Sequence, residues 1–175
     1  MSFRLIECTP DTHGGAVRDI FNDAILNTTA LYEYRPRSLD TVLAWFGEKA
    51  RAGQPVIGAV NEDDTLCGFA TWGTFRARPA YKYTIEHSVY VHPAWRRRGV
   101  ARLLMRELIA RATSAGFHAM IGGIDASNHE SIVLHEQLGF TAAGTIREAA
   151  WKFGRWLDLA FYELLLSGPA HPTEE

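Results

Sequence analysis

Three consecutive arginines, Arg96, Arg97 and Arg98, stand directly before Gly99, where an amphipathic helical pattern begins. The first N–H groups of a helix have no internal partners and carry partial positive charge, and a glycine lets a phosphate approach the backbone closely. Arginine side chains would add charge-assisted donors. The turn lacks the spacing of a P-loop or a nicotinamide dinucleotide site. We expect a different anion to bind here, although such a cluster can also be an ordinary solvated surface.

Glu86 is a charged residue inside the largely apolar run Tyr83–Val91. Because side chains alternate along a strand, Glu86 would share one face with Ser88 and Tyr90, whereas His87 would lie on the other face. A carboxylate in a partly dry cleft can accept a proton, since desolvation raises its pKa. Glu86 is therefore a candidate base; the alternative is a solvent-facing glutamate.

The bulk composition indicates one globular domain. The chain has 175 residues, of which 47% are hydrophobic, so it can bury one sizeable core. We expect a single domain over residues 1–168 and a polar tail over 169–175. The net charge of -2 argues against a protein built as a whole to bind nucleic acid or an anionic membrane. No signal-peptide pattern and no run of about 18 apolar residues occur, which favours the cytoplasm.

Metal and disulfide chemistry are not indicated. Cys8 and Cys67 are far apart and have no second ligand at metal-like spacing, so we expect two buried thiols. His13, His92 and His129 show no convincing ligand spacing either. We therefore expect no metal.

Hydrophobic periodicity predicts seven strands and four helices. Ser38 is the expected cap of the second helix, and Ser127 with Glu130 has the spacing of a capping box. The expected helices run from the Thr9–Thr12 turn to about Asn27, then over Ser38–Gly53, Gly99–Ala115 and Ser127–Leu138. The expected strands are Phe3–Cys8, Pro55–Val60, Leu66–Phe75, Tyr83–Val91, His118–Ile124, Thr141–Arg147 and Leu157–Leu166.

The resulting order βααβββαβαββ combines hairpins in the first half with strand–helix–strand crossovers in the second. This order predicts an α/β (α+β) fold whose mixed sheet carries helices on both faces. It is not the order of a doubly wound dinucleotide-binding fold.

The segment around the arginines resembles the general N-acetyltransferase (GNAT) superfamily. Arg96–Ala101 is similar to its Gln/Arg-x-x-Gly-x-Gly/Ala motif, and the strand Ser88–Pro93 precedes it. Ile124–Asn128 and then Ser131–Phe140 look like the later strand end and the closing helix of that superfamily. Four matches in the right order make this resemblance specific.

Further segments resemble one branch of this superfamily, the phosphinothricin N-acetyltransferases with the methionine sulfoximine and methionine sulfone acetyltransferases. These segments are Asn27–Ala30, Arg76–Tyr81, Glu86–Val91 and Lys152–Asp158. The resemblance covers nearly the whole chain and excludes only the tail after Gly168. It implies a GNAT-like acyl-CoA N-acyltransferase fold, acetyl-CoA as co-substrate, a small amine as acceptor and a homodimer.

The resemblance also implies a cofactor site, position by position. Backbone groups of one strand would hold the pantetheine arm, and the arginine turn would hold the pyrophosphate. The implied cofactor-binding residues are Val89, Tyr90, Val91, Arg97, Arg98, Gly99, Val100, Ala101, Arg102 and Asn128.

Acetylation of an amine by a thioester needs a base, a polarised carbonyl and a proton for the leaving thiolate. Glu86 is our candidate base, directly or through water, and a backbone N–H at Val89 or Tyr90 could polarise the carbonyl. His135 stands where many members of the superfamily have a tyrosine acid. Its unperturbed pKa of about 6.5 would suit an acid. It could equally be a buried, hydrogen-bonded histidine, and both interpretations stay open.

Substrate recognition is expected just before the central strand. On an extended segment, Arg76 and Arg78 would point the same way and could clamp a carboxylate, phosphinate or sulfoximine oxygen; alternatively both are surface residues. Tyr32, Tyr81 and Trp156 could wall an amino-acid pocket or fill a core. The expected substrate contacts are Arg76, Ala77, Arg78, Glu86, His87 and Ser88.

Three other functions remain in competition. A non-catalytic acyl-CoA sensor would keep the arginine turn, but Glu86 argues against it. Nucleic-acid binding through Arg96–Arg98, Arg102 and Arg106 would call for interleaved stacking aromatics, and Trp95 alone is adjacent. A peptide or protein amine is the remaining alternative acceptor, and it would need an open groove.

Overall fold

The structure is a computed structural model that describes residues 2–174. The chain forms two compact units: residues 2–72 with 88–108, and residues 73–87 with 109–174. Strand β4 (Thr84–Val91) and helix α3 (Val100–Ser114) each run through both units. Within residues 2–174, no helix is both long enough and apolar enough to cross a membrane.

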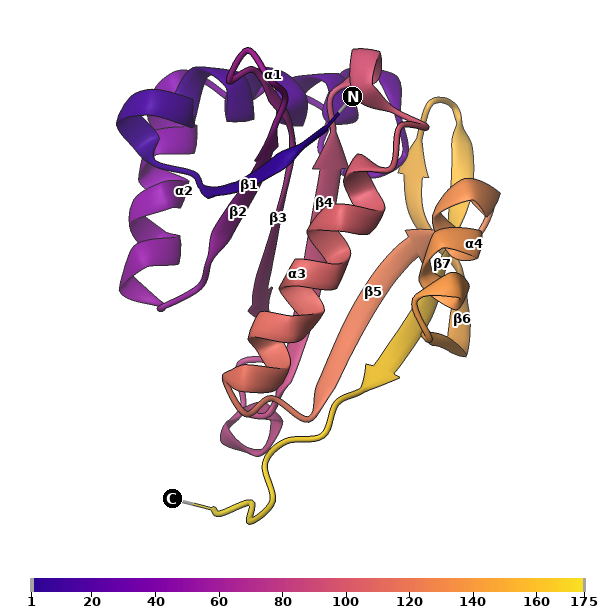
Figure 1. The fold of residues 1–175 in the computed structure, drawn as a ribbon. Coiled ribbons are helices and arrows are strands. Elements are labelled where there is room, and N and C mark those ends of the chain that lie inside the picture. Colours follow the sequence, from indigo (N-terminus) through magenta and orange to yellow (C-terminus); the bar gives the residue numbers. More distant parts are fainter. Residues whose placement is uncertain (1, 175) are drawn as a thin grey trace. The chain divides into compact units, whose positions relative to one another are not determined.

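The first unit is a strand meander with two helices packed against it (Figure 1). β1 pairs antiparallel with β2, and β2 pairs antiparallel with β3. In helix α2, Ser38 caps the N-terminus as expected, because its Oγ accepts from the Thr41 N–H at 3.1 Å. The bounds are β1 Arg4–Glu7, α1 Pro10–Asn27, α2 Leu39–Arg51, β2 Val56–Val60 and β3 Leu66–Thr74.

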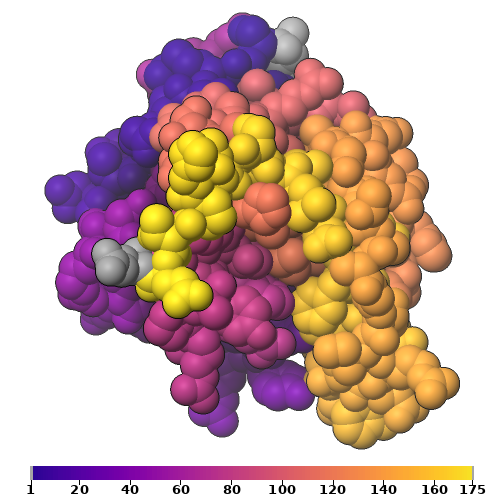
Figure 2. All heavy atoms as spheres, turned by 90° about the horizontal axis from the view of Figure 1, so that it is seen from below, coloured from indigo at the N-terminus to yellow at the C-terminus, as the bar shows by residue number. Residues whose placement is uncertain are grey.

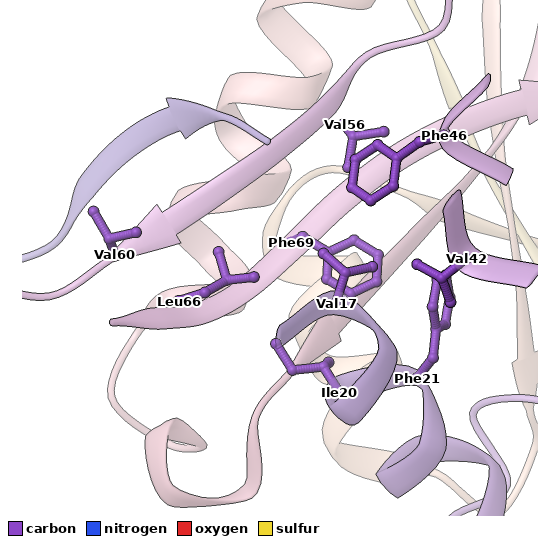
Figure 3. Close-up of a cluster of buried hydrophobic side chains, with 9 residues drawn as sticks. All are labelled: Val17, Ile20, Phe21, Val42, Phe46, Val56, Val60, Leu66 and Phe69. Atoms are coloured by element: carbon purple, nitrogen blue, oxygen red, sulfur yellow. The ribbon is translucent and has the colours of Figure 1, made fainter. Parts of the chain in front are cut away.

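A hydrophobic cluster from α1, α2, β2 and β3 holds the first unit together (Figure 3). The Phe21 ring on α1 meets the fully buried Phe69 ring of β3 edge-on, with centroids 4.9 Å apart. Residues alternate along β3, so a Cβ added to the neighbouring Gly68 would lie on the other face, 3.1 Å from the Val100 Cγ1 of α3. Helices therefore cover both faces of β3, as expected. The cluster consists of Val17, Ile20, Phe21, Val42, Phe46, Val56, Val60, Leu66 and Phe69.

The second unit contains the first half of β4 and the remaining strands. Its other elements are β5 (Ala119–Asp125), α4 (His129–Gln137), β6 (Thr141–Lys152) and β7 (Arg155–Leu165). β4 pairs parallel with β5, and β7 pairs antiparallel with both β5 and β6. The strand order is β1-β2-β3-β4-β5-β7-β6, so the predicted mixed sheet is confirmed.

The C-terminal tail returns to the second unit instead of projecting away from it. The Thr173 N–H donates to the Tyr83 hydroxyl at 3.1 Å, and the His118 Nδ1 lies 3.0 Å from the Gly168 carbonyl oxygen. Figure 2 shows this segment in yellow, lying over the surface. The predicted division into one domain and a tail stays a prediction.

Two local predictions about the second unit are wrong. Asn128, not Ser127, caps α4, because its Oδ1 accepts from the Ser131 N–H at 3.1 Å. Strand β6 continues to Lys152 instead of ending near Arg147. The extension contains few β-branched residues, so pairing with β7 supplies the strand structure that local propensity does not predict.

Candidate active site

The arginine turn is built by two residues with left-handed backbone. After β4, a single 3-10 turn over Pro93–Trp95 leads to Arg97 at φ 60° and Gly99 at φ 85°, and α3 begins at Val100. Arg96 itself is extended, and Gly99 leads directly into α3, whose first backbone N–H groups have no internal partners and suit an anion. A Cβ on Gly99 would meet nothing within 4 Å, so glycine is favoured here by its positive φ and not by lack of space.

The protein itself holds the side chains of Arg96 and Arg98. Arg96 forms an ion pair with Asp23 of α1, and its Nε donates to the Val91 carbonyl at 3.3 Å. The Arg98 guanidinium lies over the Trp95 ring, 5.2 Å from its centroid. Both side chains therefore brace the turn, and the anion-binding geometry comes mainly from the backbone.

The end of β4 is anchored through the side chain of Tyr90. Its ring lies 5.1 Å from that of Phe21 and 5.4 Å from that of Phe69, inside the first unit. The backbone of Gly68 lies close to that of Tyr90, since a Cβ added to Gly68 would be 2.7 Å from the Tyr90 carbonyl oxygen. The Tyr90 side chain thus belongs to the core, and a ligand contact at this position would use the backbone.

Glu86 is half-buried on β4 in the second unit. Burial raises its pKa, and the nearby Arg76 charge lowers it by less. The carboxylate lies over β5, because an added Cβ on Gly123 would be 3.3 Å from Glu86 Oε1. Glu86 therefore has the environment expected of a base that exchanges protons closer to neutrality than an exposed glutamate.

The segment with Arg76 and Arg78 is bent, which overturns the expectation of an extended clamp. The Arg78 N–H donates to the Arg76 carbonyl at 2.9 Å, so alternation along a strand does not orient these side chains. Arg76 lies over the Phe75 ring at 5.1 Å and close enough to Glu86 to affect its pKa. Both arginines and Ala77 are exposed. The structure thus brings Arg76 close to the candidate base.

His87 and His135 are buried against each other. Their side chains are 7% and 1% exposed, and their Nε2 atoms are 3.0 Å apart. The His135 Nδ1 also lies 2.7 Å from the Ser131 carbonyl oxygen. This geometry is that of the buried, hydrogen-bonded alternative for His135. The proposed substrate contact of His87 stays a prediction, and its burial counts against it.

The turn before α4 contains a buried carboxylate that sequence analysis did not identify. Asp125 is 4% exposed and accepts from the Ser127 N–H at 3.0 Å and the Ser127 hydroxyl at 2.9 Å. Arg155 donates to the same carboxylate at 3.3 Å. This network shapes the turn that presents Asn128, whose Oδ1 is used for capping. The Asp-x-Ser spacing was the available signal, because it is typical of Asx turns.

No group of three or more potential metal ligands occurs among the residues that the structure describes. Cys8 and Cys67 are free thiols; Cys67 is buried and Cys8 partly so. Burial raises the pKa of Cys8 to about 12, which makes it a poor nucleophile.

Comparison with known proteins identifies the family to which these features belong. The acetyltransferase (GNAT) family model matches residues 17–140, well over half of the chain. The chain belongs to the GNAT acetyltransferase family. The family and the enzyme class expected from the sequence are thereby confirmed.

Relatives of this GNAT protein act on amino-acid-like amines, to judge by their names. An L-methionine sulfoximine/L-methionine sulfone acetyltransferase of Salmonella typhimurium is 41% identical over 157 residues, covering 90% of this chain and 91% of the relative. An L-amino acid N-acyltransferase of Escherichia coli K12 is 38% identical over the same shares. A phosphinothricin acetyltransferase of Sinorhizobium meliloti, solved with acetyl-CoA, is 33% identical with a TM-score of 0.93, covering 98% and 93% of the two chains.

Proposed function

We propose that this GNAT protein transfers the acetyl group of acetyl-CoA to the amino group of a small amino-acid-like substrate. Phosphinothricin, methionine sulfoximine and methionine sulfone are the proposed substrate types, because proteins so named cover nearly the whole chain. The observation that carries the chemistry is Glu86, a half-buried carboxylate with a raised pKa on β4. The homodimer and the cytoplasmic location implied above stay predictions.

The residues of the arginine turn fit the pyrophosphate of acetyl-CoA. Arg97 and Gly99 have left-handed backbone and lead into the N-terminus of α3, and the turn is braced by Arg96 and Arg98. When bound, acetyl-CoA supplies the thioester that is attacked. The strand end Val89–Val91 is the proposed contact for the pantetheine arm through its backbone, and Asn128 remains a further proposed contact.

Glu86 would accept the proton that the substrate ammonium must lose before its nitrogen can attack. Ionised Glu86 is required for this step, and desolvation makes it a stronger base than an exposed glutamate. A backbone N–H at Val89 or Tyr90 of the same strand would polarise the thioester carbonyl. Arg76 beside Glu86 is the side chain best placed to attract an anionic group of the substrate.

A thiol-release assay tests this proposal. Free thiol from acetyl-CoA would be measured with phosphinothricin, methionine sulfoximine, methionine sulfone, ordinary amino acids and short peptides. We expect release with at least one of the first three and little with peptides. Binding of acetyl-CoA with no release for any amine would establish the sensor alternative, and preference for peptides would establish the peptide-amine alternative.

Glu86→Gln is expected to lower kcat by about 10²- to 10⁴-fold, the usual contribution of a positioned base. Its KM for acetyl-CoA should stay close to wild type, because the carboxamide keeps the shape. In wild type, kcat/KM should rise with pH as Glu86 ionises, with a midpoint above the ordinary value of 4.5. The variant should lose this limb of the pH profile.

Glu48→Gln is the matched control, because Glu48 is an exposed glutamate of α2 in the other unit. It should retain the wild-type rate and pH profile. An unchanged rate in Glu86→Gln would exclude Glu86 as the base.

A further inference from the structure

The contact between His87 and His135 defines where their protons are. A hydrogen bond between two ring nitrogens needs a proton on one and a lone pair on the other. The His135 Nδ1, 2.7 Å from the Ser131 carbonyl oxygen, must carry a hydrogen, because that oxygen can only accept. In an uncharged His135 the Nε2 is then bare, so it accepts from the Nε2–H of His87 at 3.0 Å.

The surroundings favour this uncharged state. The His87 Nδ1 is fully buried, and no residue in the described part of the chain hydrogen-bonds it, so a proton there would be an unsatisfied buried donor. Phe140 packs edge-on against both rings, at 5.5 and 5.1 Å. Burial lowers the pKa of His87 to about 3 and also lowers that of His135.

Tyr162, Glu136 and Glu86 are ionisable groups near the pair in the second unit. Tyr162 of β7 has its ring 6.4 Å from that of His135, and its hydroxyl donates to Glu136 of α4 at 3.5 Å. Glu86 is the chain neighbour of His87, but its side chain leaves β4 on the opposite face. None of these carboxylates forms an ion pair with either imidazole.

Strand β5 is shaped to admit the pair. An added Cβ on Gly122 would lie 2.7 Å from the His87 Nε2 and 3.2 Å from the His135 Nε2. The imidazoles therefore occupy the space that any other residue at position 122 would fill. The pair thus links β4, through His87, to α4, through His135, across the backbone of β5.

We propose that His87 and His135 are an uncharged positioning pair that fixes β4 beside Glu86, and that His135 is not the acid for the leaving thiolate. This inference rests on the proposed function, because it concerns the strand that carries the proposed base. Both His135 nitrogens are engaged: the Nδ1–H with Ser131 and the bare Nε2 with His87. His135 has no exposed proton to give away, and its effect on turnover would pass through the backbone of β4.

Nitrogen NMR of the histidine rings in the wild-type protein tests the proton positions without any assay of activity. We expect His135 as the Nδ1–H tautomer and His87 as the Nε2–H tautomer, with the His87 ring not titrating between about pH 5 and pH 8, where an ordinary histidine does. Titration of His87 in that range, or a proton on the His135 Nε2 in the neutral state, would overturn the proposal.

Two variants at position 135 test the role in turnover. In His135→Gln the amide oxygen can still accept from the His87 Nε2–H, whereas His135→Leu cannot. We expect Gln to keep kcat within about tenfold of wild type with an unchanged pH profile, and Leu to lose clearly more kcat at unchanged KM for acetyl-CoA. An acid would instead lose about 10²- to 10⁴-fold in both variants, together with the alkaline limb of the profile.

Stability and function are separated by the remaining controls. Thermal unfolding of both variants shows whether each is folded at the assay temperature. The NMR test uses the wild-type protein, so it decides the proton positions even if neither variant folds. Wild-type turnover in Glu86→Gln would refute the proposed base while leaving the tautomers as assigned. Tautomers other than those proposed would refute the pair while leaving Glu86 as the base.

Discussion

Two adjacent glycines on β5 show how finely single residues shape the site. Gly122 is buried beneath the two imidazoles, whereas Gly123 is exposed and lies next to the Glu86 carboxylate. Because side chains alternate along a strand, a methyl group at each position would meet a different partner. A substitution at Gly122 would therefore disturb the buried histidine pair, whereas one at Gly123 would disturb the proposed base.

Gly123→Ala is expected to lower kcat several-fold with little change in Tm. Its methyl group would approach Glu86 Oε1 at 3.3 Å and displace the carboxylate, which lowers kcat. Tm changes little because replacing a strand glycine by alanine contributes about 0.5–1 kcal/mol to the free energy of unfolding, which offsets the loss from the close contact. Gly122→Ala should instead lower Tm markedly, because its methyl group must displace a buried imidazole at 2.7 Å. Kinetics and thermal unfolding of both variants check this. Equal effects on Tm would contradict it.

At the scale of elements, the arginine turn depends on helix α1. The Arg96–Asp23 ion pair joins the turn to that helix, and the Asp23 side chain is only 20% exposed. From their sequence alone, all three arginines are possible anion ligands, because nothing in the spacing indicates an acidic partner 73 residues away. The contact makes Arg96 a brace for the turn.

Asp23→Asn should raise the KM for acetyl-CoA by about three- to tenfold, because a partly exposed ion pair contributes about 1 kcal/mol. kcat at saturating acetyl-CoA should change little, since Glu86 is unaffected. Asp19→Asn is the control: Asp19 pairs with Arg18 of its own helix rather than with the turn, and its side chain is 61% exposed. A KM that is unchanged or lower in Asp23→Asn would show that the brace is not needed for binding.

At the scale of the whole molecule, buried ionisable groups link folding to pH. His87 has a pKa near 3 when folded and about 6.5 when unfolded, so the unfolded chain binds more protons between these values. Stability therefore rises with pH across that window and is lost as the pH falls through it. His135 acts in the same direction, because burial lowers its pKa as well.

Urea unfolding at a series of pH values should show this loss between about pH 6.5 and pH 4. His87→Gln should show a shallower dependence, because glutamine binds no proton, even if its stability at neutral pH is lower. His129→Gln is the comparison variant, because His129 is an exposed histidine of the same chain. A slope in His87→Gln as steep as that of wild type would assign the acid sensitivity to other groups.

The sequence by itself determined the element order, the family and most of the helix and strand bounds. These follow from local periodicity, caps and glycine positions, which depend on neighbours a few residues away. The family motif at Arg96–Ala101 and the resemblance over the rest of the chain led to the same enzyme class that the comparisons confirm. Glu86 was singled out because a charge within an apolar strand is itself a local anomaly.

Only the tertiary structure decided which side chains meet. The insertion of β7 between β5 and β6, the burial of His135 on His87 and the pairing of Arg96 with Asp23 all join residues far apart in the chain. The bend at Arg78 came from a local hydrogen bond that residue types do not specify. Contacts of this kind depend on the packing of whole elements, so the spacing of residues indicates which groups could do chemistry, while packing sets their partners and their protonation.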